Sequence, residues 1–109
     1  MSNNFDIKQG SVTFRTQENK LDWSDGEVRP FMNLDNQGNS ILIFKDSDNV
    51  FKVFHVYLGK GRTDLEWNPL SSLHSDRPYF FAVTWDTESS KKISLYVDGE
   101  FKTDVTIPY

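Results

Sequence analysis

Apolar and polar side chains alternate along much of this chain, and the alternation is clearest from residue 79 to residue 101. Between Tyr79 and Trp85, two interleaved sets of mostly apolar residues fall on opposite faces of an extended chain, so both faces can be buried. This pattern predicts a central strand. A second run starts at Ile93 and ends at Asp98 and Gly99, which favour a two-residue type I′ hairpin because both positions need positive φ.

Three earlier runs have the length and punctuation of strands. In the run 11–15, two apolar residues alternate with polar ones, which predicts a half-solvated antiparallel strand. The run 28–34 contains Pro30, which has no N–H to donate and therefore favours an edge position or a bulge. The run 40–44 is apolar on both faces, as expected of a buried sandwich strand.

The run 50–58 has apolar residues on both faces and one basic residue on each, Lys52 and His55. We expect the face that includes Lys52 to point inward, because a lysine can lay its stem over apolar surface near a strand end. The apolar members of that face are Val50, Phe54, Val56 and Leu58.

The stretch 59–78 is the longest irregular one, with two glycines and two prolines, and Leu65 and Trp67 mark a short strand within it. Loops of this length in compact domains are often functional. The chain shows no long helical pattern, and short strands separated by turn residues predict an all-β fold, an antiparallel β-sandwich.

Composition narrows the classes of partner. We expect a single domain at residues 10–109, preceded by a flexible or edge-strand segment at residues 1–9. The net charge of −4 gives no footprint for nucleic acid, and the absence of cysteine excludes disulfides and thiolate metal sites. No apolar run has the length of a signal peptide or a membrane span, so we expect no membrane insertion, and a secreted protein would contain this chain as a mature or excised domain.

Four short motifs occur along the chain: GSVTF at 10–14, NSILIF at 39–44, FAVTWD at 81–86 and LYVDG at 95–99. Their order and spacing resemble those of laminin G-like domains, and the likeness covers residues 10–103. The resemblance implies a jelly-roll sandwich of the concanavalin A-like type. It also implies a non-catalytic recognition or adhesion module for a glycan or protein ligand, outside the cell or on its surface as part of a larger protein.

Two strands of the resembled family lack an equivalent in this sequence. Family members have an opening strand before the first motif and a closing strand after the last, and only short peptides occupy those places here. Sheet edges without these strands invite pairing with another chain. The alternative function is therefore a structural or assembly domain that forms homo-oligomers, or docks on a partner, through its edge strands.

Carbohydrate binding would use exposed aromatic rings that stack on sugars, with polar groups close by for the hydroxyls. The best candidate group is Trp67 with Asn68, Arg62 and Asp64, and the second is Trp23 with its polar neighbours. The alternative for Trp67 is that its ring folds back over a sheet edge. Trp85, in contrast, is expected in the core.

Calcium is the cofactor that the resemblance suggests, because many laminin G-like and lectin-like domains bind it through loop carboxylates and carbonyls. Asp46, Asp48 and Asn49 crowd one turn and are the candidate ligands. Such clusters also occur in plain turns, where Asp and Asn bond their own backbone, and the spacing does not match an EF-hand.

Catalysis has weaker support. His55 and His74 are the conventional bases available to a Ser-His-Asp arrangement, and we expect His55 to be an ordinary sheet residue. A reduced glycoside hydrolase, the least favoured alternative, needs two facing carboxyls. The nearest pairs are Asp64 with Glu66 and Asp86 with Glu88, in loop-like sequence, so we expect no enzyme activity.

Overall fold

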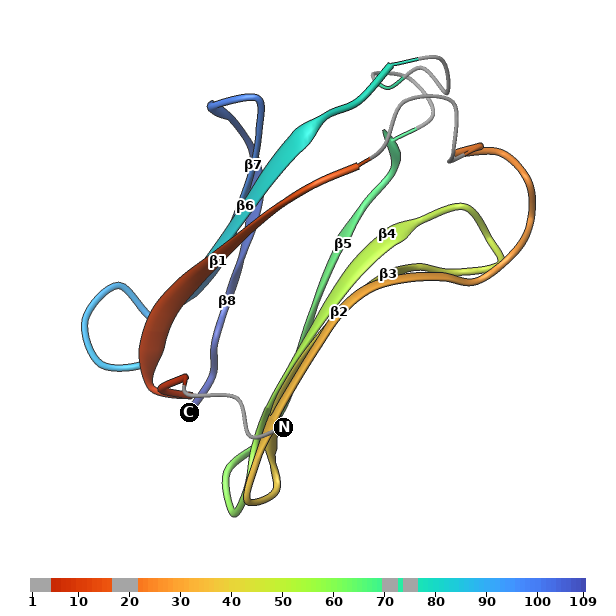
Figure 1. Ribbon diagram of the computed structural model, residues 1–109. Coiled ribbons are helices and arrows are strands. Elements are labelled where there is room, and N and C mark those ends of the chain that lie inside the picture. Colours follow the sequence, from red (N-terminus) through yellow and green to blue (C-terminus); the bar gives the residue numbers. More distant parts are fainter. Residues whose placement is uncertain (1–4, 17–21, 70–72, 74–76) are drawn as a thin grey trace.

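The computed structural model describes residues 5–16, 22–69, 73 and 77–109, which form two four-stranded antiparallel sheets that face each other (Figure 1). The first sheet has the order β1-β6-β7-β8, with β1 at Gln9–Arg15, β6 at Phe80–Asp86, β7 at Lys92–Val97 and β8 at Glu100–Thr106. The second has the order β2-β3-β4-β5, with β2 at Arg29–Asn36, β3 at Asn39–Lys45, β4 at Phe51–Tyr57 and β5 at Gly61–Trp67. The expected all-β antiparallel sandwich is confirmed. Among the described residues, no helix is long and apolar enough to cross a membrane.

Strand β6 lies inside the first sheet, between β1 and β7, so its expected central position is confirmed. Its inward residues, among them Phe81 and Trp85, are buried, but Phe80 on the outer face is 48% exposed. The expected burial of both faces is therefore wrong, because no described segment covers the outer face of this sheet. Asp98 and Gly99 have φ values of 52° and 80°, as a type I′ hairpin between β7 and β8 requires.

The expectations for the runs around β2 and β3 are also confirmed. Strand β2 is an edge of the second sheet, and its pairing with β3 is interrupted by a bulge between Pro30 and Met32. Strand β3 is internal, with Ile41 and Ile43 fully buried. Lys45 continues the same inward face, a position at which a lysine must have its charge compensated.

Strand β4 faces the core with the side opposite to the expected one. Phe51, Val53 and His55 are buried, whereas Leu58, beyond the end of the strand, is 64% exposed. The reason lies in the two basic residues. The Lys52 ammonium pairs with the carboxylate of Asp46 in a solvent-facing turn, which the outer face permits. The imidazole of His55 is neutral when it is buried and finds hydrogen-bond partners inside.

The short strand expected at Leu65 and Trp67 within the stretch 59–78 is confirmed, but it starts earlier than expected, because β5 pairs with β4 over all seven of its residues. Thr63 and Leu65 point inward and are buried, while the charged residues that alternate with them point outward. The charged residues made this segment look like a polar loop in the sequence, although they form the solvent-facing side of a half-buried strand. Residues 70–72 and 74–76, which include His74, lie outside the described residues.

Four phenylalanines from four strands join the two sheets. The ring of Phe81 stacks on Phe14 at 5.0 Å and on Phe51 at 5.1 Å, and Phe14 stacks on Phe31 at 5.3 Å. Because Phe14 and Phe81 come from one sheet and Phe31 and Phe51 from the other, this cluster fixes how the sheets face each other.

The expected N-terminal segment of residues 1–9 is described from residue 5 onward. The carbonyl of Asp6 accepts a hydrogen bond from the indole of Trp85 at 2.7 Å, and the carbonyl of Lys8 accepts one from the N–H of Thr87 at 2.7 Å. Gln9 then begins β1, an edge strand. The segment therefore lies against one end of the sandwich, close to the chain's C-terminal end in Figure 1.

Candidate functional site

Lys45 is a fully buried lysine whose charge is neutralised at the end of β3. Its Nζ donates to the carbonyl of Glu27 at 2.7 Å and to Oδ1 of Asn49 at 3.0 Å, and it pairs with Oδ1 of Asp25 at 2.8 Å. The hydrogen bond from Lys45, together with one from the N–H of Glu27, holds the pKa of Asp25 well below its usual range. We call these four residues the Lys45 latch. It ties the loop before β2 to the β3–β4 turn, so its role is structural.

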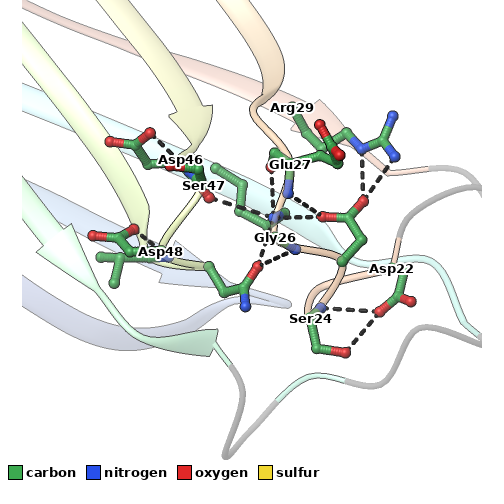
Figure 2. Close-up of polar contacts among 12 residues, drawn as sticks. Asp22, Ser24, Gly26, Glu27, Arg29, Asp46, Ser47 and Asp48 are labelled. Carbon is green, nitrogen blue, oxygen red and sulfur yellow. Dashed lines mark hydrogen bonds and ion pairs between the residues drawn. The ribbon is translucent and has the colours of Figure 1, made fainter.

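The turn with the candidate calcium ligands lies beside the latch in Figure 2. Lys52 Nζ pairs with Asp46 Oδ2 at 2.8 Å and with Asp48 Oδ2 at 3.2 Å, and this contact lowers the pKa of Asp46. The other carboxylate oxygens accept backbone N–H groups of the turn, and Asn49 Oδ1 accepts the N–H of Gly26 at 2.8 Å. Calcium binding here stays a prediction, and the ion would have to displace the Lys52 ammonium.

The described residues contain no group of three or more His, Cys, Asp or Glu side chains that could hold a metal ion. The candidate turn contributes two carboxylates and one amide, and both carboxylates already contact a lysine. A lysine ammonium at this place supplies the positive charge that a calcium ion would otherwise bring.

The structure separates the members of the candidate sugar-binding group at Trp67. Arg62 and Asp64 lie on the outer face of β5, where Arg62 Nε pairs with Asp64 Oδ1 at 2.8 Å and the guanidinium lies 4.2 Å from the centre of the Phe54 ring. Trp67 has the opposite parity, so its half-buried ring packs against the core, with Lys102 of β8 at 6.0 Å. Asn68 follows as an exposed residue. Binding of sugar by these residues stays a prediction, but they do not form one cluster.

Trp23, the second aromatic candidate, is 2% exposed. Its ring packs on Phe31 at 5.9 Å and on Phe81 at 5.8 Å, and it belongs to the core. The expectation that Trp23 is exposed, as stacking on a sugar requires, is therefore wrong. Burial of the large apolar ring stabilises the fold, and this gain decides its position although its sequence neighbours are polar. Trp85 is in the core as expected.

The aspartate of each candidate acid pair is held by intramolecular contacts. Asp64 is bound to Arg62, and Asp86 accepts backbone N–H groups of Glu88 and Ser89 at 2.9 Å and 3.0 Å. The hydrogen bonds from the loop, with Ser89 contributing most, lower the pKa of Asp86. A general acid in glycoside hydrolysis needs the opposite shift.

A pocket of about 240 Å³ opens at the end of the sandwich where Lys8 and Tyr109 lie. Its lining residues come from segments far apart in the sequence, and they are Lys8, Tyr57, Lys60, Thr87, Glu88 and Tyr109. We call it the terminal pocket. The rings of Tyr57 and Tyr109 are half-buried and meet edge to face at 6.1 Å between centroids.

The side chains of Lys8, Lys60 and Glu88 form no hydrogen bond or ion pair with another part of the chain that the structure describes. Two ammonium groups are thus available as donors and one carboxylate as an acceptor. The Thr87 hydroxyl donates to the carbonyl of Lys8 at 3.0 Å, which leaves its own lone pairs to accept. The terminal pocket therefore combines aromatic walls with unused polar groups of both kinds.

His55 supports the pocket from inside the core. Its Nε2 lies 2.8 Å from the carbonyl of Ile7, which can only accept, so Nε2 carries the proton. Burial lowers the pKa of His55, so the ring is neutral and Nδ1 can only accept. The single proton of the Tyr109 hydroxyl lies within reach of two acceptors, Nδ1 at 3.0 Å and the backbone carbonyl of His55 at 3.1 Å. The rings of His55 and Tyr109 also stack at 6.0 Å. The C-terminal tyrosine is thereby held in a fixed position.

Gly61 lets the Tyr109 ring approach the start of β5. A Cβ at Gly61 would lie 3.3 Å from Tyr109 Cε1, and the φ of Gly61 is +145°, which side chains rarely adopt. This pocket has no periodic signal in the sequence, because its residues come from four separate segments of the chain. The available signals were the chain-end tyrosine and the two lysines in turns.

No family model matches this chain, and comparison with curated proteins finds no match. Its structure is similar to mouse laminin alpha1 chain domains LG4-5, with a TM-score of 0.69 and 17% identity, over 99% of this chain and 26% of that one. It is also similar to HCR/D, solved as a tryptophan-to-alanine mutant, with a TM-score of 0.68 and 16% identity, over 94% of this chain and 26% of that one. The chain thus spans about a quarter of each of these two. It has the laminin G-like jelly-roll fold.

Proposed function

We propose that this chain is a non-catalytic recognition module that binds carbohydrate in the terminal pocket. The observation that carries the proposal is the pocket itself, in which two half-buried tyrosine rings lie beside two lysines and a glutamate without intramolecular partners among the described residues. A sugar presents apolar C–H faces and a rim of hydroxyls that both donate and accept. Aromatic faces and mixed polar groups match these two properties.

The volume of the pocket indicates the size of the ligand. At about 240 Å³ it lies just below the usual range of small-molecule sites, about 300 to 1,000 Å³. We infer that it accepts one sugar residue, such as the end of a glycan chain, with the rest of the glycan in solvent. Few contacts per sugar give weak binding, so affinity would come from multivalent display.

The proposal includes a location outside the cell or on its surface, which is that of the laminin G-like neighbours. The structural neighbours, the laminin domains and HCR/D, support a binding role in general. A protein ligand that presents a flexible polar side chain to the same pocket is the alternative within this proposal.

The test is a glycan-array screen, with and without calcium, of the native chain and of three alanine variants. Tyr57→Ala removes one pocket wall, Trp67→Ala removes the aromatic ring of the other candidate group, and Phe80→Ala removes an exposed ring far from both in the sequence and serves as the control. We expect binding to be lost in Tyr57→Ala alone. Binding that survives in Tyr57→Ala and disappears in Trp67→Ala would show that the glycan binds at β5 and not in the terminal pocket. Binding that occurs only with calcium would favour a calcium site at the Asp46 turn.

A further inference from the structure

The four edge strands of the sandwich differ in how they are protected from pairing with another chain. Strand β2 contains Pro30 and a bulge, and the pairing of β7 with β8 has a bulge between Leu95 and Tyr96. Strands β5 and β8 carry several charged residues and lie next to each other. All of these features block edge-to-edge pairing. Strand β1 has none of them, since its register with β6 is continuous and its one charged residue is Arg15, at its end.

The backbone of β1 presents unused hydrogen-bonding groups at this edge. The carbonyl of Lys8 and the N–H of Thr16 are directed toward the neighbouring chain segment that contains β6. Because this direction alternates from residue to residue in an antiparallel strand, the N–H and C=O groups of Ser11, Thr13 and Arg15 point the other way. The sheet order places no described strand on that side.

The same side of the sandwich also leaves apolar side chains incompletely covered. We call it the open side, and it lies between the free edges of β1 and β2, where Phe14 stacks on Phe31. The residues that are only partly buried there, although they pack against the core, are Val12, Phe14, Phe31, Met32 and Leu34. A strand added to β1 would remove more of this apolar surface from water.

We propose that β1 pairs with β1 of a second copy of this chain, antiparallel and about a twofold axis at Val12, to form a continuous eight-stranded sheet. This register overlaps all seven residues and places Ser11 opposite the partner's Thr13. The two residues exchange both of their backbone hydrogen bonds in this position. Arg15 lies opposite the partner's Gln9, so no like charges meet.

The inward side chains are also self-complementary in this register. Phe14 lies opposite the partner's Gly10, where the Trp85 ring fills the place of the missing Cβ, so two aromatic rings come together. Val12 packs against the partner's Val12. Shifting the strands by two residues in either direction shortens the paired stretch and separates Phe14 from Gly10. The sequence of β1 is thus complementary to itself in antiparallel register, and for this reason a second copy of the chain fits this edge better than an unrelated strand.

Pairing would have a consequence for the terminal pocket, although it does not depend on that pocket. Lys8 lies four residues from Val12, so the two Lys8 residues of a dimer would be about 27 Å apart along the strands. The two pockets would then lie at opposite ends of the joined sheet and could bind two glycan ends at once. A single domain would still bind one sugar, so failure of either proposal leaves the other untouched.

Sedimentation equilibrium of the native chain over a wide concentration range, combined with amide hydrogen exchange, tests the pairing. We expect a reversible dimer and protection of the amides of Ser11, Thr13 and Arg15 that increases with protein concentration. A strict monomer at the highest concentration would overturn the proposal. So would a dimer in which these three amides exchange equally fast at all concentrations.

Two charge variants test the register. Ser11→Lys with Thr13→Lys places like charges opposite each other twice in the dimer, and should weaken association about tenfold. Ser11→Glu with Thr13→Lys changes the same exposed residues but places opposite charges there, and should associate at least as tightly as the native chain. Equal weakening by both variants would refute this register. Circular dichroism checks the fold of each variant, and Thr13→Pro, which removes one free-edge N–H, is the substitute if either fails to fold.

Discussion

The Lys45 latch allows the sharpest stability prediction. Methionine at Lys45 keeps most of the buried stem and removes the ammonium, which donates to three oxygens at 2.7 to 3.0 Å. Three hydrogen bonds to a charged group are worth about 1.5 to 3 kcal/mol each. The ammonium no longer has to be desolvated, which returns several kcal/mol. We expect a net loss of about 3 kcal/mol, in line with breaking one side of a buried ion pair.

Urea unfolding followed by tryptophan fluorescence measures this loss. A cost of this size corresponds to a fall in melting temperature of roughly 12 °C or more for a domain of about 100 residues. Lys60→Met, at an exposed turn, is the matched control and should lie within about 0.5 kcal/mol of the native chain. If Lys45→Met is as stable as the control, then the latch does not hold the loop. If the latch holds the loop, the double variant Lys45→Met with Asp25→Leu should lose less stability than the sum of the losses in the two single variants.

Three further predictions concern the core, the pocket and pH. Phe81→Ala, at the centre of the aromatic cluster, should destabilise the fold by about 4 kcal/mol in urea unfolding, and a value near zero would contradict that cluster. Gly61→Ala should weaken glycan binding more than Gly59→Ala, as measured by titration calorimetry. Both glycines have positive φ, but only a Cβ at Gly61 would press on Tyr109, so equal effects would separate the pocket from that ring. Because burial lowers the pKa of His55, the unfolded chain binds a proton more readily than the folded one below pH 6.5. The contribution of His55 to the free energy of unfolding is therefore complete above pH 6.5 and is lost as the pH falls toward the pKa of the folded state. In urea unfolding at a series of pH values, His55→Gln should make the free energy of unfolding depend less on pH in this range.

The sequence predicted the fold where local pattern and tertiary environment agree. The alternation around Phe81 and the Asp98 and Gly99 turn specify a strand and a hairpin by local geometry alone. Pro30 marked an edge because its missing N–H has the same consequence in any sheet. These features need no knowledge of the rest of the molecule.

The predictions were wrong where contacts with distant parts of the chain determine which side chains are buried. Lys52 and His55 lie on opposite faces of β4, and which one is buried depends on a carboxylate in the preceding turn and on the carbonyl of Ile7. Trp23 looked exposed among polar neighbours, yet it is held by rings from two other strands. A single sequence does not encode these distant partners in any periodic form.

The terminal pocket was out of reach for the same reason. Lys8 and Tyr109 are almost the full chain length apart in the sequence, and they line one pocket because the fold brings the segment before β1 and the segment after β8 to the same end of the sandwich. The Trp67 group was chosen for closeness in sequence, but β5 is a strand, and strand alternation sends Trp67 inward and Asp64 outward.

The most direct measurement of carbohydrate recognition is an NMR titration of the ¹⁵N-labelled chain with the oligosaccharide that gives the strongest array signal. Shift changes that concentrate on the backbone amides of the pocket segments, around Lys8, Tyr57, Thr87 and Tyr109, are the predicted result. Changes that concentrate instead on Trp67 and Asn68, or an array on which no glycan binds, would contradict recognition through the terminal pocket.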